Sequence, residues 1–308
     1  MKKKFKINNV SLVIAIALLI VMYLFGAAKY NRFGSLSTIL NLFNDNAYLI
    51  VVSVGMTFVL LTGGIDISVA SIVAFTGVFA AFLLEKGWAA APVIALTLFI
   101  GAFVGFLQGY AVHEFKIAPF LITLAGQFLM RGMCAVVSTI SIPITNDFFK
   151  SAALAKISWV TASGSRPKLY YYVFFAIAIV IIAWYILRFT RFGRAVYAVG
   201  SNEQSAQYMG LNVKGVKVGV YAINGFCSAL GGILFSFYTL AGYSLQNMGM
   251  ELDAISSAVI GGTLLTGGVG TVIGSMVGVL IQGIIQTIVT YQNLNTWWTK
   301  VTIAAILC

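Results

Sequence analysis

The residues best suited to chemistry lie in one short segment, Gly63-Gly64-Ile65-Asp66-Ile67-Ser68, between two apolar runs. The two glycines allow the backbone to leave a helix, and Asp66 and Ser68 place carboxylate and hydroxyl oxygens beside it. Asp66 is suited to cap the next helix by accepting its first amides, which is the role we favour. An acidic side chain in such an apolar setting is also typical of a transport path, and capping does not exclude that role.

The segment belongs to an internal repeat. The same five residues occur twice, as Leu60-Leu61-Thr62-Gly63-Gly64 and as Leu264-Leu265-Thr266-Gly267-Gly268. Each copy separates two apolar runs. Transporters are often built from repeated halves whose broken helices meet near the substrate path. Because Leu, Thr and Gly are common in membrane helices, coincidence is the alternative. The repeat therefore predicts that a translocation path is bordered by Gly63, Gly64, Asp66, Ser68, Gly267 and Gly268.

A second informative segment is the basic stretch 188–217. Ser201 or Asn202 can cap a short helix, and Glu203 follows at a position where the helix dipole favours an anion. Gly210 suits the C-terminal end of that helix. A short helix between two spans is what a membrane subunit needs to receive force from a soluble motor, although any ordered loop could carry one.

The sequence contains few residues that could carry out catalysis or bind a metal. One His and three Cys leave almost no material for a metal site or a nucleophilic triad. No G-x-x-x-x-G-K-[ST] loop occurs, so the chain cannot bind ATP by that route. We therefore expect a non-catalytic protein without a cofactor of its own. An intramembrane enzyme is disfavoured because no paired carboxylates lie within the spans.

The elements that must position these residues are apolar helices. Of 308 residues, 60% are hydrophobic and 9% are charged, and the mean hydropathy is +0.97. This composition excludes a soluble enzyme, a disulfide scaffold, a disordered chain and a nucleic-acid module, and it predicts an all-α polytopic membrane protein. Since a crossing helix needs about 20 apolar residues, we expect about ten spans, with internally repeated halves and broken helices. They lie near 10–28, 47–62, 67–84, 90–112, 117–140, 169–187, 218–243, 254–266, 270–291 and from 297 onward.

The charges predict the topology. With the N-terminus in the cytosol, the inner segments 1–9, 113–116 and 188–217 carry ten Lys or Arg against two Glu, while the outer segments carry seven against five acidic residues. This bias follows the positive-inside rule. Segment 188–217 is then cytosolic and 141–168 extracytoplasmic. Within the latter, Phe149, Ala153 and Ile157 recur at helical spacing, which predicts an interfacial helix over 147–158.

Two further expectations concern the position of Arg131 and the length of the last span. Arg131 lies toward the outer end of its span, where reaching to the interface is favoured over contact with substrate. The final span stops at Cys308 after 12 residues, which is about 18 Å of helix and too short to cross. We expect that the sequence has lost its C-terminal end.

Several motifs in order along the chain resemble one family, the permease subunits of bacterial sugar ABC importers of the ribose, xylose and galactose type. They are Gly55-Met56-Thr57, Gly63 to Val69, Pro119 to Gly126 with Arg131-Gly132, Arg191 to Arg194, Ala198 to Asn202 with Ala206 and Gly210, Ile260 to Thr263, and Gly267 to Thr271. Within the family the chain most resembles the galactofuranose-type permease, through Ser141 to Ile144, Tyr243, Glu251 to Ile255 and Trp297 to Lys300.

This resemblance implies one transmembrane permease domain over 1–308 and an inner-membrane location in a bacterium. It implies a second, different permease chain, an ATPase subunit that binds ATP and Mg, and an extracytoplasmic sugar-binding protein. Segment 201–210 would be the coupling helix seated in the ATPase, with Ser201, Asn202, Glu203, Ala206 and Gly210 as its residues. The substrate would be a monosaccharide, with galactofuranose as the first candidate.

A transporter driven by an ion gradient is the alternative. Such proteins usually carry several acidic or His relays within the membrane, and only Asp66 comes near that description. A neutral sugar instead needs groups that match hydroxyls, together with aromatic faces. The candidates that we considered for this purpose are Thr57, Ser68, Asn224, Gln282 and Tyr243.

Overall fold

The computed structural model describes residues 2–31, 33–158, 160, 166–295 and 297–307. These residues form a helical bundle with two small antiparallel β-pairs, in agreement with the predicted all-α class. The helices are α1 (Lys2–Lys29), α2 (Leu36–Leu61), α3 (Val69–Glu85), α4 (Ala90–Glu114), α5 (Pro119–Val137), α6 (Asp147–Leu154), α7 (Tyr171–Phe189), α8 (Arg191–Ser201), α9 (Glu203–Tyr208), α10 (Val213–Thr239), α11 (Met250–Ile260), α12 (Val272–Tyr291) and α13 (Trp297–Leu307). The strands are β1 (Ile142–Pro143), β2 (Lys156–Ser158), β3 (Lys168–Tyr170) and β4 (Ala241–Gly242).

Each predicted span contains a helix, but the helices differ in length. Within the described part of the chain, seven helices are long and apolar enough to cross a membrane: α1 from Val10, α2, α4, α5, α7, α10 and α12. Helices α3, α11 and α13 are shorter, so ten crossings stay a prediction. The expected loss of the C-terminal end depends on Cys308, which lies outside the described residues.

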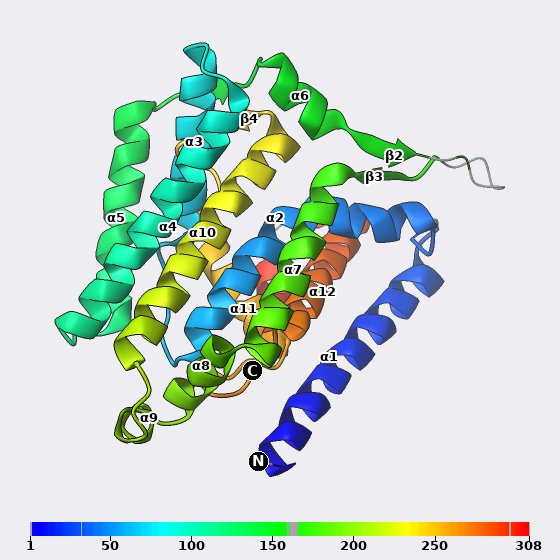
Figure 1. Ribbon diagram of the computed structural model, residues 1–308. Coiled ribbons are helices and arrows are strands. Elements are labelled where there is room, and N and C mark those ends of the chain that lie inside the picture. Colours follow the sequence, from blue (N-terminus) through cyan, green and yellow to red (C-terminus); the bar gives the residue numbers. More distant parts are fainter. Residues whose placement is uncertain (1, 32, 159, 161–165, 296, 308) are drawn as a thin grey trace.

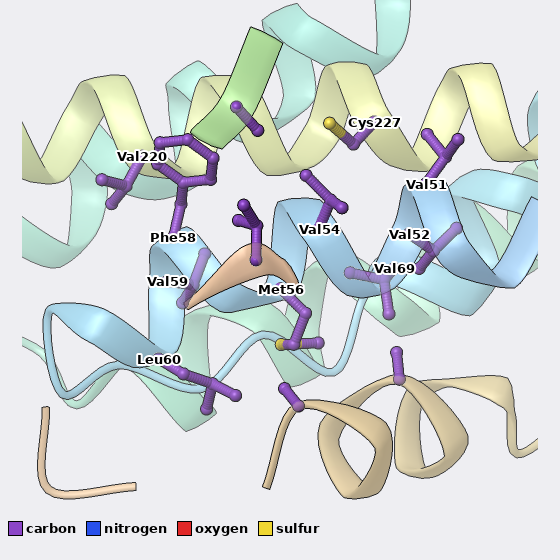
Figure 2. Packing of buried hydrophobic residues seen from close by; sticks show 14 of the residues in the cluster. Val51, Val52, Val54, Met56, Phe58, Val59, Leu60, Val69, Val220 and Cys227 are labelled. Atoms are coloured by element: carbon purple, nitrogen blue, oxygen red, sulfur yellow. The ribbon is translucent and has the colours of Figure 1, made fainter. Parts of the chain in front are cut away.

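Helix α2 forms the centre of the bundle. Its residues from Leu49 to Leu61 are all buried, as expected of a helix that is apolar on every side. It packs against α7, α10, α11 and α12. Figure 2 shows its buried side chains together with Val69 of α3 and with Val220 and Cys227 of α10.

The remaining helices surround this centre. Helix α10 packs against α4, α2 and α3, and its contact with α4 is so close that a Cβ added at Gly105 would meet the Tyr221 carbonyl. Helix α1 lies along the edge of the bundle, mainly against α12 (Figure 1). Helices α1, α4 and α5 leave most of their apolar surface exposed. Such surface is suited to lipid.

The two ends of the bundle are built differently. Helices α8 and α9 lie at the same end as the start of α1, whereas α6 and the β-pairs lie at the opposite end (Figure 1). At that opposite end β1 pairs with β4, placing Ile142 opposite Gly242, and β2 pairs with β3, placing Ile157 opposite Leu169. We call these the α8–α9 end and the β end.

The predicted interfacial helix over 147–158 is wrong in its length and in its exposure. Helix α6 ends at Leu154, and Ile157 lies in β2 with an exposed side chain. Phe149 and Ala153 are buried, and the ring of Phe149 lies 4.4 Å from that of Phe237, centroid to centroid. The apolar face of α6 therefore packs on α10.

Arg131 is likewise held within the protein. Its Nη1 donates to the carbonyl oxygens of Ser244 and Gln246, at 2.7 and 3.0 Å. This contact ties α5 to the segment between α10 and α11, so the side chain anchors a loop at the β end. The sequence predicted that Arg131 reaches to the membrane interface. It did not predict these two hydrogen bonds to the loop.

Helix α2 begins at Leu36, well before the predicted start at residue 47. Ser35 caps it by accepting a hydrogen bond from the Thr38 amide. The added turns contain Asn41, Asn44 and Asp45, and the charge of Asp45 had limited the predicted apolar span. These polar residues are helical because they face cavities and neighbouring chain segments, as described below.

Candidate functional site

The Asp66 carboxylate is completely buried and fully bonded. Its Oδ1 accepts hydrogen bonds from the amide and the hydroxyl of Ser68, at 2.8 and 2.6 Å, and its Oδ2 accepts one from Asn224 Nδ2 at 2.7 Å. Gln108 Nε2 donates to the Ser68 hydroxyl at 2.9 Å. The network thus joins the start of α3 to α4 and α10. The predicted capping of α3 by Asp66 is wrong, because α3 begins at Val69 with Ser68 as its N-cap residue, and the bond to the Ser68 amide closes a turn just before the helix. Asp66 is held by this turn and by Asn224, which lies 158 positions away in sequence.

The two copies of the repeat contact each other. The Gly268 amide donates to the Leu61 carbonyl at 2.9 Å and so satisfies a carbonyl at the C-terminal end of α2. Gly63 and Gly267 have φ angles of +77° and +82°, in the left-handed region that glycine adopts most easily. We call the two segments Leu60–Gly64 and Leu264–Gly268 together the glycine junction. The geometry brings together the two breaks that the repeat identified; whether they border a path stays a prediction.

Helix α9 has the predicted cap. Between the two capping alternatives the structure selects Asn202, whose Oδ1 accepts from the Ser205 amide at 2.8 Å, while Ser201 ends α8. Glu203 occupies the first turn and pairs with Lys217 of α10 at 2.7 Å. Gly210 follows the helix with a φ of +76°.

One residue of this segment faces inward. Ala206 was expected among the residues seated in a partner. It is completely buried in the protein core, so its side chain cannot contact a partner. The largest exposed side chains here are those of Tyr208, the last residue of the helix, and Met209 just after it, which are 91% and 68% exposed. A partner at the α8–α9 end would meet these two residues.

Three adjoining cavities of about 450, 360 and 390 Å³ lie near the β end. The first two share Asn41, Asp45 and Tyr238, and the last two share Asn46, Tyr48 and Gln286. We call them the polar groove. Its further lining includes Asn44, Lys168, Tyr170, Thr287, Thr290, Tyr291, Asp253, Gln282, Trp297 and Lys300.

The polar groove depends on two helices with polar stripes. On α2, the residues Asn41, Asp45 and Tyr48 follow one another at helical spacing, and on α12 Gln286 and Thr290 do the same. Asn44 faces the adjoining strand β3, where it donates to the Lys168 carbonyl at 2.8 Å and accepts from the Tyr170 amide at 3.2 Å. The start of α2 is thereby fixed against the β end.

The chemistry of the groove suits a small hydroxylated ligand. Carboxylates and amide oxygens accept hydrogen bonds from hydroxyls, while amide nitrogens and Lys300 donate to them. The rings of Tyr48, Tyr238 and Trp297 add flat apolar faces. Such a mixture of convergent polar groups and aromatic walls is typical of sites for small molecules.

Most residues predicted to meet substrate lie elsewhere. Of the five sugar-contact candidates only Gln282 lines the groove, where its Nε2 donates to the Ser256 hydroxyl at 2.6 Å. Thr57 bonds to the Ser275 hydroxyl at 2.6 Å, and Asn224 and Ser68 bond to Asp66. None of the six predicted path residues, all of them described, lines these three cavities.

Sequence reasoning missed the groove because it began the apolar span after the charged Asp45 and assigned no role to Asn41 and Asn44. The usable signal was the helical spacing of the polar residues themselves. A stripe of Asn, Asp and Tyr that continues into an apolar helix indicates a polar wall as readily as a loop.

Comparisons with known proteins show the family to which the chain is related. Residues 38–308 match the family model described as branched-chain amino acid transport system / permease component. The inner membrane ABC transporter permease protein YjfF of Escherichia coli (strain K12) is 42% identical over 97% of this chain and 90% of its own length. The fructose import permease protein FruG of Bifidobacterium longum is 36% identical over 99% and 91%, and the ribose import permease protein RbsC of Haemophilus influenzae is 35% identical over 89% and 84%. No solved structure matches the chain.

Proposed function

This chain belongs to the permease family of bacterial sugar ABC importers of the ribose, xylose and galactose type, and we propose that it conducts a monosaccharide that enters through the polar groove. The family consists of non-catalytic, multi-pass subunits of the inner membrane. An importer of this kind includes an ATPase and a sugar-binding protein. The observation that carries the proposal is the groove, because its lining matches hydroxyl groups and sugar faces.

The proposed path follows α2. Its first turns line the groove with Asn41, Asp45 and Tyr48, and its last residue, Leu61, belongs to the glycine junction. One rigid helix therefore connects the entry to the inner break. In this proposal Gly63, Gly64, Asp66, Ser68, Gly267 and Gly268 border the inner end of the path, where Asp66 fixes the geometry through its network.

We place the β end outside the cell and the α8–α9 end in the cytosol. The basic residues of segments 1–9 and 188–217 support this orientation, since positive charge favours the cytosolic side. The groove then opens toward the binding protein. The coupling segment, with the exposed residues Ser201, Asn202, Glu203 and Gly210 around the buried Ala206, then faces the ATPase, which binds ATP and Mg.

The exposed polar residues of the groove also support a second permease chain beside this one, and the resemblance to the galactofuranose-type system implies that it is a different chain. Asn41, Asp45 and Gln286 are exposed on helices that are long enough to cross a membrane. Polar side chains at such positions face protein or water because lipid cannot satisfy them. A second permease beside the groove would complete its open side.

The substrate class is tested by uptake. Cells without monosaccharide importers of their own receive this chain together with the ATPase, the binding protein and the second permease of its importer. We expect uptake of labelled galactofuranose in preference to ribose or galactopyranose. Equal uptake of ribose would contradict the galactofuranose assignment, and absence of uptake of every monosaccharide would contradict the proposed function.

The groove itself is tested by Asp45→Asn, which keeps the shape of the side chain and removes its charge. A hydrogen bond to a charged group contributes about 1.5–3 kcal/mol, so the apparent affinity for sugar should fall by about 10- to 100-fold. Asp147→Asn is the matched control because Asp147 is exposed near the β end and lines none of the three cavities. Equal affinity in the two variants would remove the groove from the path.

A further inference from the structure

The last turn of α8 lies directly on the glycine junction. A Cβ added at Gly200 would overlap the Leu61 carbonyl oxygen and lie 2.7 Å from the Gly268 amide nitrogen. These are the two atoms whose hydrogen bond joins the copies of the repeat. The backbone of α8 at Gly200 therefore contacts both copies at the point where they meet.

A second bond fixes the same face of α8. The Tyr197 hydroxyl donates to the Gly270 carbonyl at 2.8 Å, two residues beyond the second copy. Tyr197 and Gly200 are three positions apart and share one face of the helix. On the same face, the Ser201 side chain would lie 2.6 Å from a Cβ placed on Gly268. The contact thus covers a full helical turn.

The same helix is joined to α9 without a linker. Asn202 ends α8 by donating its amide to the Ala198 carbonyl at 3.1 Å, and its side chain caps α9. Because one residue belongs to both helix ends, α9 cannot shift without moving the last turn of α8. The exposed Tyr208 and Met209 lie at the far end of α9.

We infer that the last turn of α8 transmits displacement of α9 to both glycine breaks at once, with Gly200 and Tyr197 as positioning residues. This inference rests on the proposed function, which supplies the motor that moves α9. The glycines of the junction suit the receiving role, because residues with positive φ at helix ends absorb changes in backbone direction with little side-chain hindrance.

A competing route runs through α10. Glu203 pairs with Lys217 of α10, and Asn224 of α10 holds Asp66 beside the first break. That route begins with a partly exposed ion pair, which transmits little force because such pairs contribute little energy. These contacts also lead to the first break alone, whereas α8 contacts both.

The test measures sugar import and ATP hydrolysis together, in vesicles that hold the chain assembled with its ATPase, binding protein and second permease. Gly200→Ala places a methyl group on the junction. Overpacking of this kind biases a packed contact by an amount that corresponds to roughly a tenfold change in an equilibrium. We expect import per ATP hydrolysed to fall about tenfold, with hydrolysis per assembled complex retained. Gly132→Ala is the matched control, since a Cβ there meets no atom within 4 Å.

Tyr197→Phe provides a second variant that removes a single hydroxyl. Loss of one hydrogen bond should lower import per ATP about threefold. A Gly200→Ala complex with a wild-type ratio would overturn the inference, because the methyl group cannot fit without moving the junction. If Gly200→Ala does not assemble, Tyr197→Phe decides: a lowered ratio supports the inference and an unchanged ratio overturns it. A wild-type complex that imports no sugar overturns the proposed function, and the inference with it.

Discussion

The Asp66 network permits a sharp distinction between two substitutions. Asp66→Leu removes the acceptor for the Ser68 amide and for Asn224 Nδ2, both of which are buried. The Ser68 hydroxyl retains an alternative acceptor in Gln108 Oε1 at 3.2 Å. Each orphaned donor costs about 1–3 kcal/mol, so two cost about 2–6 kcal/mol. This is a substantial part of the stability of a folded protein, about 5–15 kcal/mol, so the amount of folded protein should fall clearly.

Asp66→Asn should be tolerated. Its carbonyl oxygen can still accept from the Ser68 amide, and its new amide group faces Asn224. The Asn224 Oδ1 is buried without a hydrogen-bond partner, so a rotation of that side-chain amide presents an acceptor to the new donor. The variant therefore keeps its hydrogen bonds to the Ser68 amide and to Asn224, and its free energy of unfolding should change little.

The assay is sugar uptake normalised to the amount of membrane-inserted protein, with the inserted amount reported separately. We expect near-normal values of both for Asp66→Asn and a clearly reduced inserted amount for Asp66→Leu. Normal insertion with poor transport by Asp66→Asn would show that the charge itself serves the path. Near-normal uptake by Asp66→Leu would refute the reasoning altogether.

Three further predictions concern coupling and ATP. A Cys at the exposed Met209 should crosslink to the ATPase in a functional complex, whereas a Cys at the buried Ala206 should not, and the reverse pattern would contradict the docking surface. Gly210→Val should insert normally but lose import relative to ATP hydrolysis, because a φ of +76° costs a non-glycine residue about 1–2 kcal/mol; an unchanged ratio of import to hydrolysis would show that the turn after α9 is not needed. The purified chain alone should neither bind nor hydrolyse ATP, and hydrolysis measured without partners would contradict a permease role.

Local sequence patterns predicted what depends on local physics. Apolar runs predicted a helix in every expected span, and residue types that satisfy helix amides narrowed the cap of α9 to Ser201 or Asn202. The repeat of Leu-Leu-Thr-Gly-Gly located both breaks. These features are encoded within a few neighbouring residues, so one sequence suffices to find them.

Features that depend on distant contacts were not predictable in the same way. Asn224 and Asp66 are separated by 158 positions, and nothing local marks them as partners. Ala206 shares its helix with exposed residues, and only the packing of the core shows that it is buried. The apolar spacing of Phe149, Ala153 and Ile157 suggested one long helix, but a strand pairing interrupts it at β2.

The burial of α2 has a consequence for how the protein is made. The helices that surround it are α7, α10, α11 and α12, and the earliest of these begins at Tyr171. Synthesis proceeds from the N-terminus, so α2 leaves the ribosome long before its neighbours exist. During that interval Asn41, Asn44 and Asp45 have none of their final surroundings. The central helix therefore waits until α12 is made before its surroundings are complete, and it must be protected from misfolding during that interval.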